Sequence, residues 1–192
     1  MITQLKSAPN QLTLLRLATI PFIVIAVLDA HWAWALTLFL LAGISDGLDG
    51  LLARLLKQRT MLGAYLDPIA DKLLLSTLFL ELAFVGLIPW RVTVLVFSRD
   101  VIILVVCAAL YTAANFRDFT PTIFGKMNTF AQVATVFVIL LRQVWPTTIT
   151  SAAVWLGIRA TVILTVISGL HYTLRLGWQL RAGDRKTGAS QG

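Results

Sequence analysis

The sequence predicts an all-α integral membrane protein with six transmembrane helices. The chain has 192 residues, of which 58% are hydrophobic and only 13% are charged, and its mean hydropathy is +0.83. Soluble domains carry about 25% charged residues, so this composition excludes an ordinary soluble fold. The apolar stretches are also long enough to cross a bilayer, since a spanning helix needs about 20 residues.

Six apolar stretches define the predicted spans. The first is expected to stay in the protein as a helix, because it lacks a small-residue cleavage site. The second ends in a basic group, the third carries acidic residues, and the fourth holds the only cysteine, Cys107, so no internal disulfide is possible. In chain order, the spans are predicted at residues 12–30, 33–55, 62–87, 91–113, 123–145 and 152–176.

Basic residues alternate between the connections as the positive-inside rule describes. Lys6 precedes the first span and three basic residues end the second, whereas the turn between these spans carries Asp29 and His31. We therefore expect a multi-pass membrane protein with both termini in the cytoplasm. Short connections and the lack of a repeat predict one six-helix transmembrane domain, residues 1–182, and a disordered cytoplasmic tail, residues 183–192.

Four aspartates lie where the surrounding sequence predicts bilayer-spanning helix. Asp46 and Asp49 are three residues apart, and Asp67 and Asp71 are four apart, so each pair projects from one helix face. An aspartate at mid-bilayer costs roughly 2.5 to 3.5 kcal/mol, so four without partners cost on the order of 10 kcal/mol, as much as a whole domain's stability. Carboxylates without His or Cys suit Mg2+ or Mn2+, and two such ions would cancel the four charges.

Small residues and one arginine continue the first acidic face. Gly50 and Ala53 would let a bulky ligand approach the helix backbone closely, and Arg54, one turn from Gly50, could hold a phosphate at the cytoplasmic rim. The alternative is that the aspartates make buried contacts between helices and that Arg54 only sets the topology. Four carboxylates at two helical spacings favour a divalent-metal site that handles phosphate and faces the cytoplasm.

This stretch resembles the signature of the integral membrane CDP-alcohol phosphotransferases. The pattern is D, two residues, DG, two residues, AR, eight or nine residues, G, three residues, D, three residues, D. Every position is present from Asp46 through Gly63 to Asp71, with eight residues between Arg54 and Gly63. The resemblance implies the family's six-helix fold and its usual homodimer. It also implies the family's reaction, in which an acceptor hydroxyl displaces cytidine monophosphate (CMP) from a CDP-linked lipid or alcohol.

The resemblance also implies roles for individual residues. The four aspartates would hold two Mg2+ or Mn2+ ions, and Asp71 would also be the base for the acceptor hydroxyl. The nucleotide and diphosphate would be bound by a second group of residues: Gly50, Ala53, Arg54, Asn10 and Thr13.

Three further segments resemble the phosphatidylglycerophosphate and cardiolipin synthases of this family. They are Pro9–Arg16, Ser98–Val101 and Pro121–Thr129, and the last two resemble eukaryotic-type cardiolipin synthases more closely. The cations in these segments, Arg16, Arg99 and Lys126, are predicted to bind the phosphate of the acceptor or lipid. Plainer roles stay open: Asn10 and Thr13 as helix-start residues, Arg99 and Asp100 as a stabilising ion pair, and Lys126 as a topological charge.

The expected function is transfer of a phosphatidyl group from CDP-diacylglycerol to a glycerol hydroxyl. Phosphatidylglycerol as acceptor would give cardiolipin, glycerol 3-phosphate would give phosphatidylglycerophosphate, and the sequence leaves both open. Membrane lipid is an expected partner and nucleic acid is not. One alternative is a divalent-cation transporter that uses the intramembrane aspartates, although no repeated halves are visible. Another is a non-catalytic binder of a nucleotide-lipid, but the complete set of aspartates argues against lost catalysis.

Overall fold

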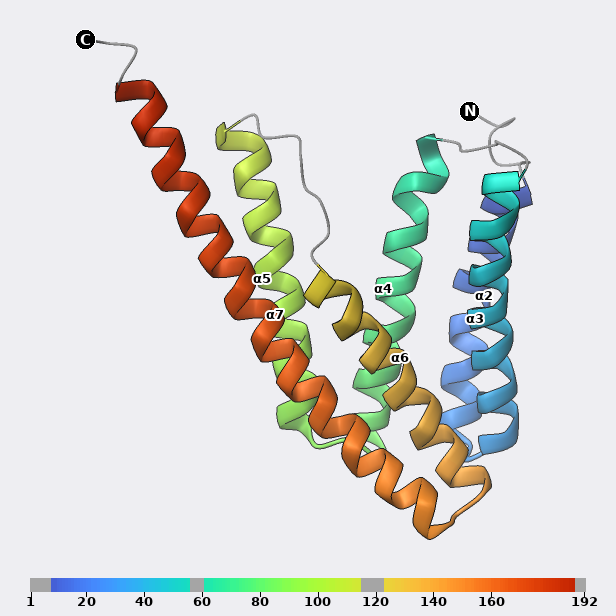
Figure 1. Cartoon of the computed structure of the whole chain (residues 1–192). Helices are drawn as coiled ribbons and strands as arrows, with labels where there is room; N and C mark the ends of the chain where they lie inside the picture. The colour runs from blue at the N-terminus through green and yellow to red at the C-terminus, as the bar shows by residue number, and fades with distance from the viewer. Residues whose placement is uncertain (1–7, 56–60, 115–122, 189–192) are drawn as a thin grey trace.

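In the described part of the chain, the computed structural model consists of six α-helices and the turns between them (Figure 1). The description covers residues 8–55, 61–114 and 123–188, with side chains for residues 13–45, 70–103, 105 and 123–173. In chain order the helices are α2 (Ala8–Leu28), α3 (Trp32–Leu55), α4 (Met61–Phe84), α5 (Trp90–Ala114), α6 (Ile123–Val144) and α7 (Thr148–Gly188).

Each predicted span coincides with one helix, so the all-helical fold class is confirmed. The last helix differs most from its prediction, because α7 continues past residue 176 and past the predicted domain boundary at residue 182 to Gly188. Arg and Lys are good helix formers, and an interior glycine such as Gly183 costs only about 1 kcal/mol relative to alanine. The predicted disordered tail is therefore helical over residues 183–188, and residues 189–192 lie outside the described residues.

Within the described residues, two segments are long and apolar enough to cross a membrane, namely Ile123–Val144 and Thr148–Thr173. Two shorter apolar segments, Thr13–Leu28 and Trp32–Ser45, lie in α2 and α3. In α4 and α5, charged residues interrupt the apolar sequence. Insertion of all six helices across the bilayer therefore stays a prediction.

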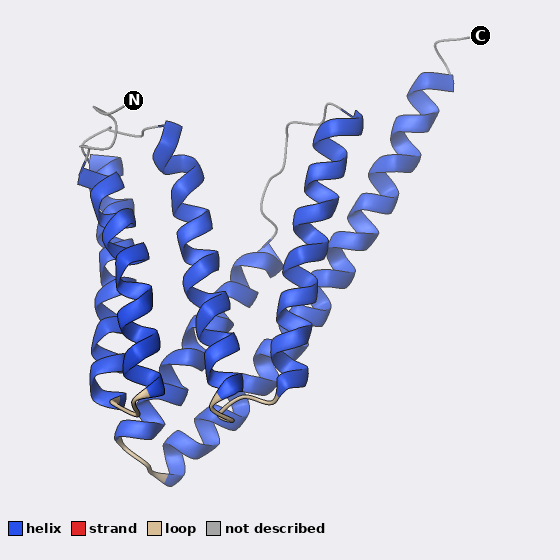
Figure 2. Ribbon diagram, turned by 180° about the vertical axis from the view of Figure 1, so that it is seen from behind, coloured by secondary structure: helices blue, strands red, loops and turns tan. Residues whose placement is uncertain are grey.

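The helices form two groups that meet at one end of the molecule (Figures 1 and 2). Helix α2 packs against α3 and α4, α5 packs against α7, and α6 packs against α7 and α3. Helix α2 begins and α7 ends at the same end of the bundle (Figure 1). The turns at residues 29–31, 85–89 and 145–147 lie at the opposite end (Figure 2).

Local sequence explains two of these turns. Gly86 adopts a left-handed backbone conformation, with φ of +78°, and ends α4 while the Leu87 amide donates a hydrogen bond to the Leu82 carbonyl. Helix α7 begins with a reciprocal cap in which the Thr150 amide donates to Thr147 Oγ1 at 3.1 Å and the Thr147 amide donates to Thr150 Oγ1 at 3.0 Å. These caps satisfy backbone groups that a helix terminus leaves unpaired.

The apolar core lies where α2, α3, α4 and α6 meet. Its side chains are almost fully buried, and they include Ile23, Val27, Phe39, Leu78, Phe79, Leu82, Ile139 and Leu140. Between membrane helices, close van der Waals packing drives association, because lipid tails are as apolar as the core itself. This core fixes α4 against α2, the two helices whose polar side chains meet in the site described below.

The contact between α6 and α7 combines a small residue with buried hydrogen bonds. Thr135 Oγ1 lies 2.9 Å from Thr161 Oγ1, and Thr165 Oγ1 donates to Asn128 Oδ1 at 2.9 Å. Gly157 faces Thr135 so closely that an added Cβ would lie 2.9 Å from Thr135 Oγ1. Small residues and polar pairs of this kind are typical of helix contacts within membranes.

Replacing Gly157 with alanine is therefore expected to destabilise the protein by about 1 to 3 kcal/mol, the usual cost of overpacking. Thr135 cannot easily move away, because its hydroxyl also donates to the Ala131 carbonyl at 2.7 Å. Reversible unfolding in mixed detergent micelles measures the change. Gly43→Ala is the matched control, since an added Cβ there has no described atom within 4 Å. Equal stability of the two variants would contradict the packing argument.

Candidate active site

The two predicted acidic pairs lie on two helices, near the end of the bundle where α2 begins. Asp46 and Asp49 belong to the second half of α3, and Asp67 and Asp71 belong to the first half of α4. Since α3 ends and α4 begins at that end (Figure 1), both pairs lie in the same half of the molecule. The helical spacing of three and four residues is confirmed by the backbone.

Helix α2 packs against both acidic helices, α3 and α4. Over the described residues, α3 and α4 make at most a marginal contact with each other. Of the four aspartates, Asp71 alone has a described side chain.

Arg16 and Asp71 form an ion pair between α2 and α4. Arg16 Nη1 donates to Asp71 Oδ1, and the arginine side chain is only 1% exposed, whereas the aspartate side chain is 43% exposed. An intramembrane cation is costly without a partner, which explains why this buried arginine contacts a carboxylate. The geometry leaves Asp71 anchored on one side and accessible on the other.

A second polar cluster begins one residue later on α4 and crosses to α5 and α7. Lys72 Nζ lies 2.5 Å from Asp100 Oδ1, and Arg99 Nη1 donates to the same oxygen at 2.8 Å. Arg99 Nη2 also donates to Ser168 Oγ on α7. Together with the Arg16 pair, this layer holds three cations and two carboxylates, so its described side chains leave one positive charge beside Asp71.

Two members of this layer, Lys72 and Ser168, are absent from the site residues predicted from the sequence. Lys72 could have been predicted, because an ionisable residue within a span is by default a candidate functional group. Ser168 could not have been predicted, since a serine in an apolar helix is ordinary and only the packing of α7 on α5 brings it to Arg99. The stabilising ion pair considered for Arg99 and Asp100 is present.

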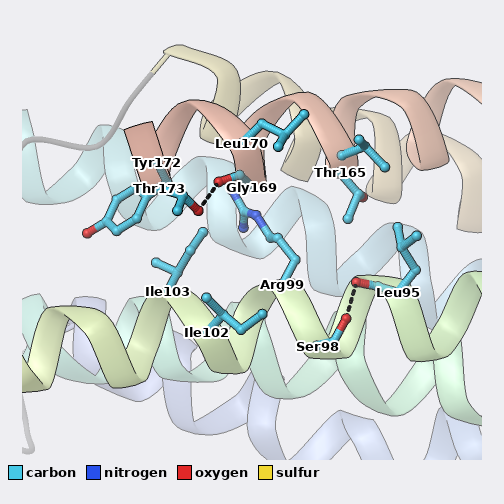
Figure 3. Close-up of a pocket in the computed structure, with 11 residues that line it drawn as sticks. Leu95, Ser98, Arg99, Ile102, Ile103, Thr165, Gly169, Leu170, Tyr172 and Thr173 are labelled. Atoms are coloured by element: carbon cyan, nitrogen blue, oxygen red, sulfur yellow. Dashed lines mark hydrogen bonds between the residues drawn. The ribbon is translucent and has the colours of Figure 1, made fainter. Parts of the chain in front are cut away.

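Of the three cations predicted to bind the acceptor or lipid phosphate, Arg99 and Lys126 line different cavities. Arg99 lines a cavity of about 300 Å³ between α5 and α7 (Figure 3), and the exposed Lys126 lines one of about 660 Å³ between α6 and α7. Thr13 is fully buried in α2. The backbones of the other predicted ligands are helical, but their side chains lie outside the described set: Asn10, Asp46, Asp49, Gly50, Ala53, Arg54 and Asp67.

The donor set suits hard divalent cations. The four acidic groups are carboxylates without accompanying His or Cys, as Mg2+ and Mn2+ prefer, and the exposed side of Asp71 leaves room for a further ligand. Among the residues with described side chains, no three acidic, His or Cys groups cluster. The residue types and helical spacings therefore fit divalent-metal ligands, and the sharing of ions between α3 and α4 stays a prediction.

Comparison with known proteins agrees with the motif. The family model for CDP-alcohol phosphatidyltransferases matches residues 6–167. A Mycobacterium tuberculosis protein named "Probable phosphatidylglycerophosphate synthase" is 36% identical over 175 residues, which cover 86% of this chain and 79% of the relative. Human "Cardiolipin synthase (CMP-forming)" is 32% identical over 184 residues, with coverage of 85% and 60%.

A third relative comes from Cereibacter sphaeroides and is named "CDP-diacylglycerol--glycerol-3-phosphate 3-phosphatidyltransferase". It is 37% identical over 142 residues, which cover 70% of this chain and 63% of the relative. Relatives named as phosphatidylglycerophosphate synthase and as cardiolipin synthase thus match at similar identity, so similarity alone does not choose between these two names. The match over most of the chain, together with the complete signature on α3 and α4, establishes that this protein belongs to the CDP-alcohol phosphatidyltransferase family of membrane-embedded transferases.

Proposed function

We propose that this protein transfers a phosphatidyl group from CDP-diacylglycerol to the hydroxyl of a glycerol-bearing acceptor and releases CMP. The observation that carries the proposal is Asp71, which ends the family signature, is anchored by a buried arginine and keeps almost half of its side chain exposed. A general base needs both a fixed position and access to the proton that it removes. Phosphatidylglycerol and glycerol 3-phosphate both supply the required hydroxyl.

In the proposed reaction, the exposed carboxylate of Asp71 accepts the proton of the acceptor hydroxyl. The acceptor oxygen then bonds to the phosphorus attached to diacylglycerol, and the bond from that phosphorus to the oxygen of CMP breaks. Arg16 keeps the carboxylate in place during this step. The excess cation of the polar layer, formed by Lys72 and Arg99 around Asp100, attracts the phosphate groups of both substrates.

Asp46, Asp49, Asp67 and Asp71 would hold two Mg2+ or Mn2+ ions. When bound, such ions neutralise the diphosphate and stabilise the charge on the departing phosphate. Gly50, Ala53 and Arg54 follow on α3 and would contact the nucleotide, with Asn10 and Thr13 on α2. We further propose that the active site and both termini face the cytoplasm, as the charge distribution predicts, and that the protein acts as a homodimer, as the family resemblance implies.

The decisive experiment incubates the purified protein in lipid vesicles with CDP-diacylglycerol and one acceptor at a time. The acceptors are glycerol 3-phosphate, phosphatidylglycerol, inositol 1-phosphate and serine, each with Mg2+, with Mn2+ or with EDTA. We expect CMP release with a glycerol-bearing acceptor, its complete loss in EDTA, and recovery when metal is added back, because the aspartates cannot bind the diphosphate directly. Release with serine or inositol 1-phosphate alone would contradict the proposed acceptor, and metal uptake into vesicles without any CMP would indicate a transporter.

A further inference from the structure

Arg159 lies inside the apolar part of α7. This segment runs from Thr148 to Thr173, and Arg159 follows Thr148 by eleven residues. A helix rises 1.5 Å per residue, so Arg159 lies about 16 Å along the segment, close to the middle of a hydrocarbon core of about 30 Å. A charged side chain at this depth is costly unless it finds a partner of opposite charge.

The Arg159 side chain is exposed on a face of α7 that no described helix covers. Over the described residues α7 packs against α5 and α6, whereas Trp155, Arg159 and Ile163 share another face at helical spacing and are all exposed. Arg16 and Arg99 each contact an aspartate, but no described carboxylate lies within ion-pair distance of Arg159. Its partner therefore has to come from the surrounding membrane.

The contact with Trp155 shows the direction in which this arginine points. Arg159 Cζ lies 3.6 Å from the centre of the Trp155 ring, which is one turn nearer to the start of α7. The side chain thus turns back along the helix, as long helical side chains do. It carries the charge toward the leaflet in which α7 begins, which is how an arginine within a span reaches lipid headgroups.

The same contact leaves the guanidinium able to bind an anion. A guanidinium stacked on an aromatic ring keeps the N–H donors at its edge, and their planar geometry matches the oxygens of a phosphate. Trp155 is 56% exposed and offers an amphipathic ring of the kind found at headgroup level. Ile163, 57% exposed and one turn further on, continues the face as apolar surface for a hydrocarbon chain.

We propose that Arg159, stacked on Trp155, binds the phosphate of an anionic phospholipid in the leaflet in which α7 begins, with one acyl chain along Ile163. An anionic lipid fits better than a zwitterionic one, because it brings no cation of its own to compete with the arginine. A partner helix with a carboxylate would be met by an arginine that extends away from α7, whereas this one lies along it.

This lipid site is separate from the polar layer around Asp71. Arg159 forms no ion pair with the described members of that layer, and it lines neither of the cavities beside α7 that contain Arg99 and Lys126. The inference therefore does not rest on the proposed function. The bound lipid would be a resident of the protein surface rather than a reactant.

The test uses phosphatidylglycerol that carries a photoreactive diazirine near the glycerol end of one acyl chain. The full-length protein in phosphatidylcholine vesicles that contain this probe is irradiated, and labels at residues 155–163 are located by mass spectrometry and counted separately from all others. We expect Arg159→Gln to lower this labelling about fivefold, the effect of one cation on an anionic lipid. Arg159→Lys should lose less, because it keeps the charge but not the planar donors.

Arg142→Gln is the matched control. Arg142 is an exposed arginine in the last turn of α6, so its replacement removes the same charge at a different helix. It should leave the labelling of residues 155–163 unchanged. Labelling needs no turnover, so a failure of the proposed transfer reaction would leave this result intact.

Three results would overturn the assignment. The first is equal labelling of residues 155–163 by photoreactive phosphatidylcholine, a comparison that needs no variant to fold. The second is unchanged phosphatidylglycerol labelling in Arg159→Gln with a normal size-exclusion profile. The third is a photoreactive residue at position 163 that captures one defined protein in native membranes in place of lipid, which would indicate a partner helix.

Discussion

Replacing Asp71 with asparagine is expected to lower the rate of CMP release by about 10²- to 10⁴-fold, the usual contribution of a general base. Asparagine has nearly the same shape but cannot take up the acceptor proton, and it also removes a carboxylate from the proposed metal site. The loss should appear with saturating CDP-diacylglycerol and acceptor, because it affects the chemical step. Initial rates at several metal concentrations measure it.

The control for this variant is Asp29→Asn, which removes an exposed aspartate in the turn at the opposite end of the bundle. It should retain full activity. Because Asp71→Asn removes the carboxylate charge that Arg16 contacts, size-exclusion profiles and unfolding midpoints must accompany the rates. A folded Asp71→Asn protein that turns over at the normal rate would eliminate the proposed base.

The second large effect is expected for Arg16→Met, which removes the charged group but fills similar space. Asp71 then loses the contact that fixes its carboxylate, and a displacement of about 1 Å at a reacting group can cost 10²-fold in rate. We therefore expect kcat to fall by about 10- to 100-fold with little change in KM. Steady-state kinetics with each substrate varied in turn provide the measurement.

The pattern of kinetic constants separates two roles for Arg16. If Arg16 binds a substrate phosphate, as the sequence predicts, KM should rise while kcat changes little. If it positions Asp71, kcat should fall, and Arg16→Lys should recover part of the rate because lysine keeps the charge but not the planar donor geometry. Adding Arg16→Met to Asp71→Asn should then cost little more, since the two residues act as a unit.

Much of the fold could be predicted from composition and hydropathy. Each predicted span coincides with a helix, because a chain that is mostly apolar over about 20 residues satisfies its backbone groups in the bilayer only as a helix. The end of α7 was misplaced, since polar residues in a tail do not by themselves stop a helix. The metal site could also be predicted from the sequence alone, because helical spacing puts Asp46 and Asp49 on one helix face and Asp67 and Asp71 on another.

The chain alone thus determined the helices, the family signature and the chemistry of its side chains, because these depend on neighbours within a few residues. Tertiary packing decided the rest: that α2 contacts both acidic helices, that Arg16 pairs with Asp71, and that Ser168 reaches Arg99. Periodicity defines which face of a helix is polar but not which helix lies opposite that face. Such partners are 55 and 69 residues apart in sequence, and only the rotation and crossing of whole helices bring them together.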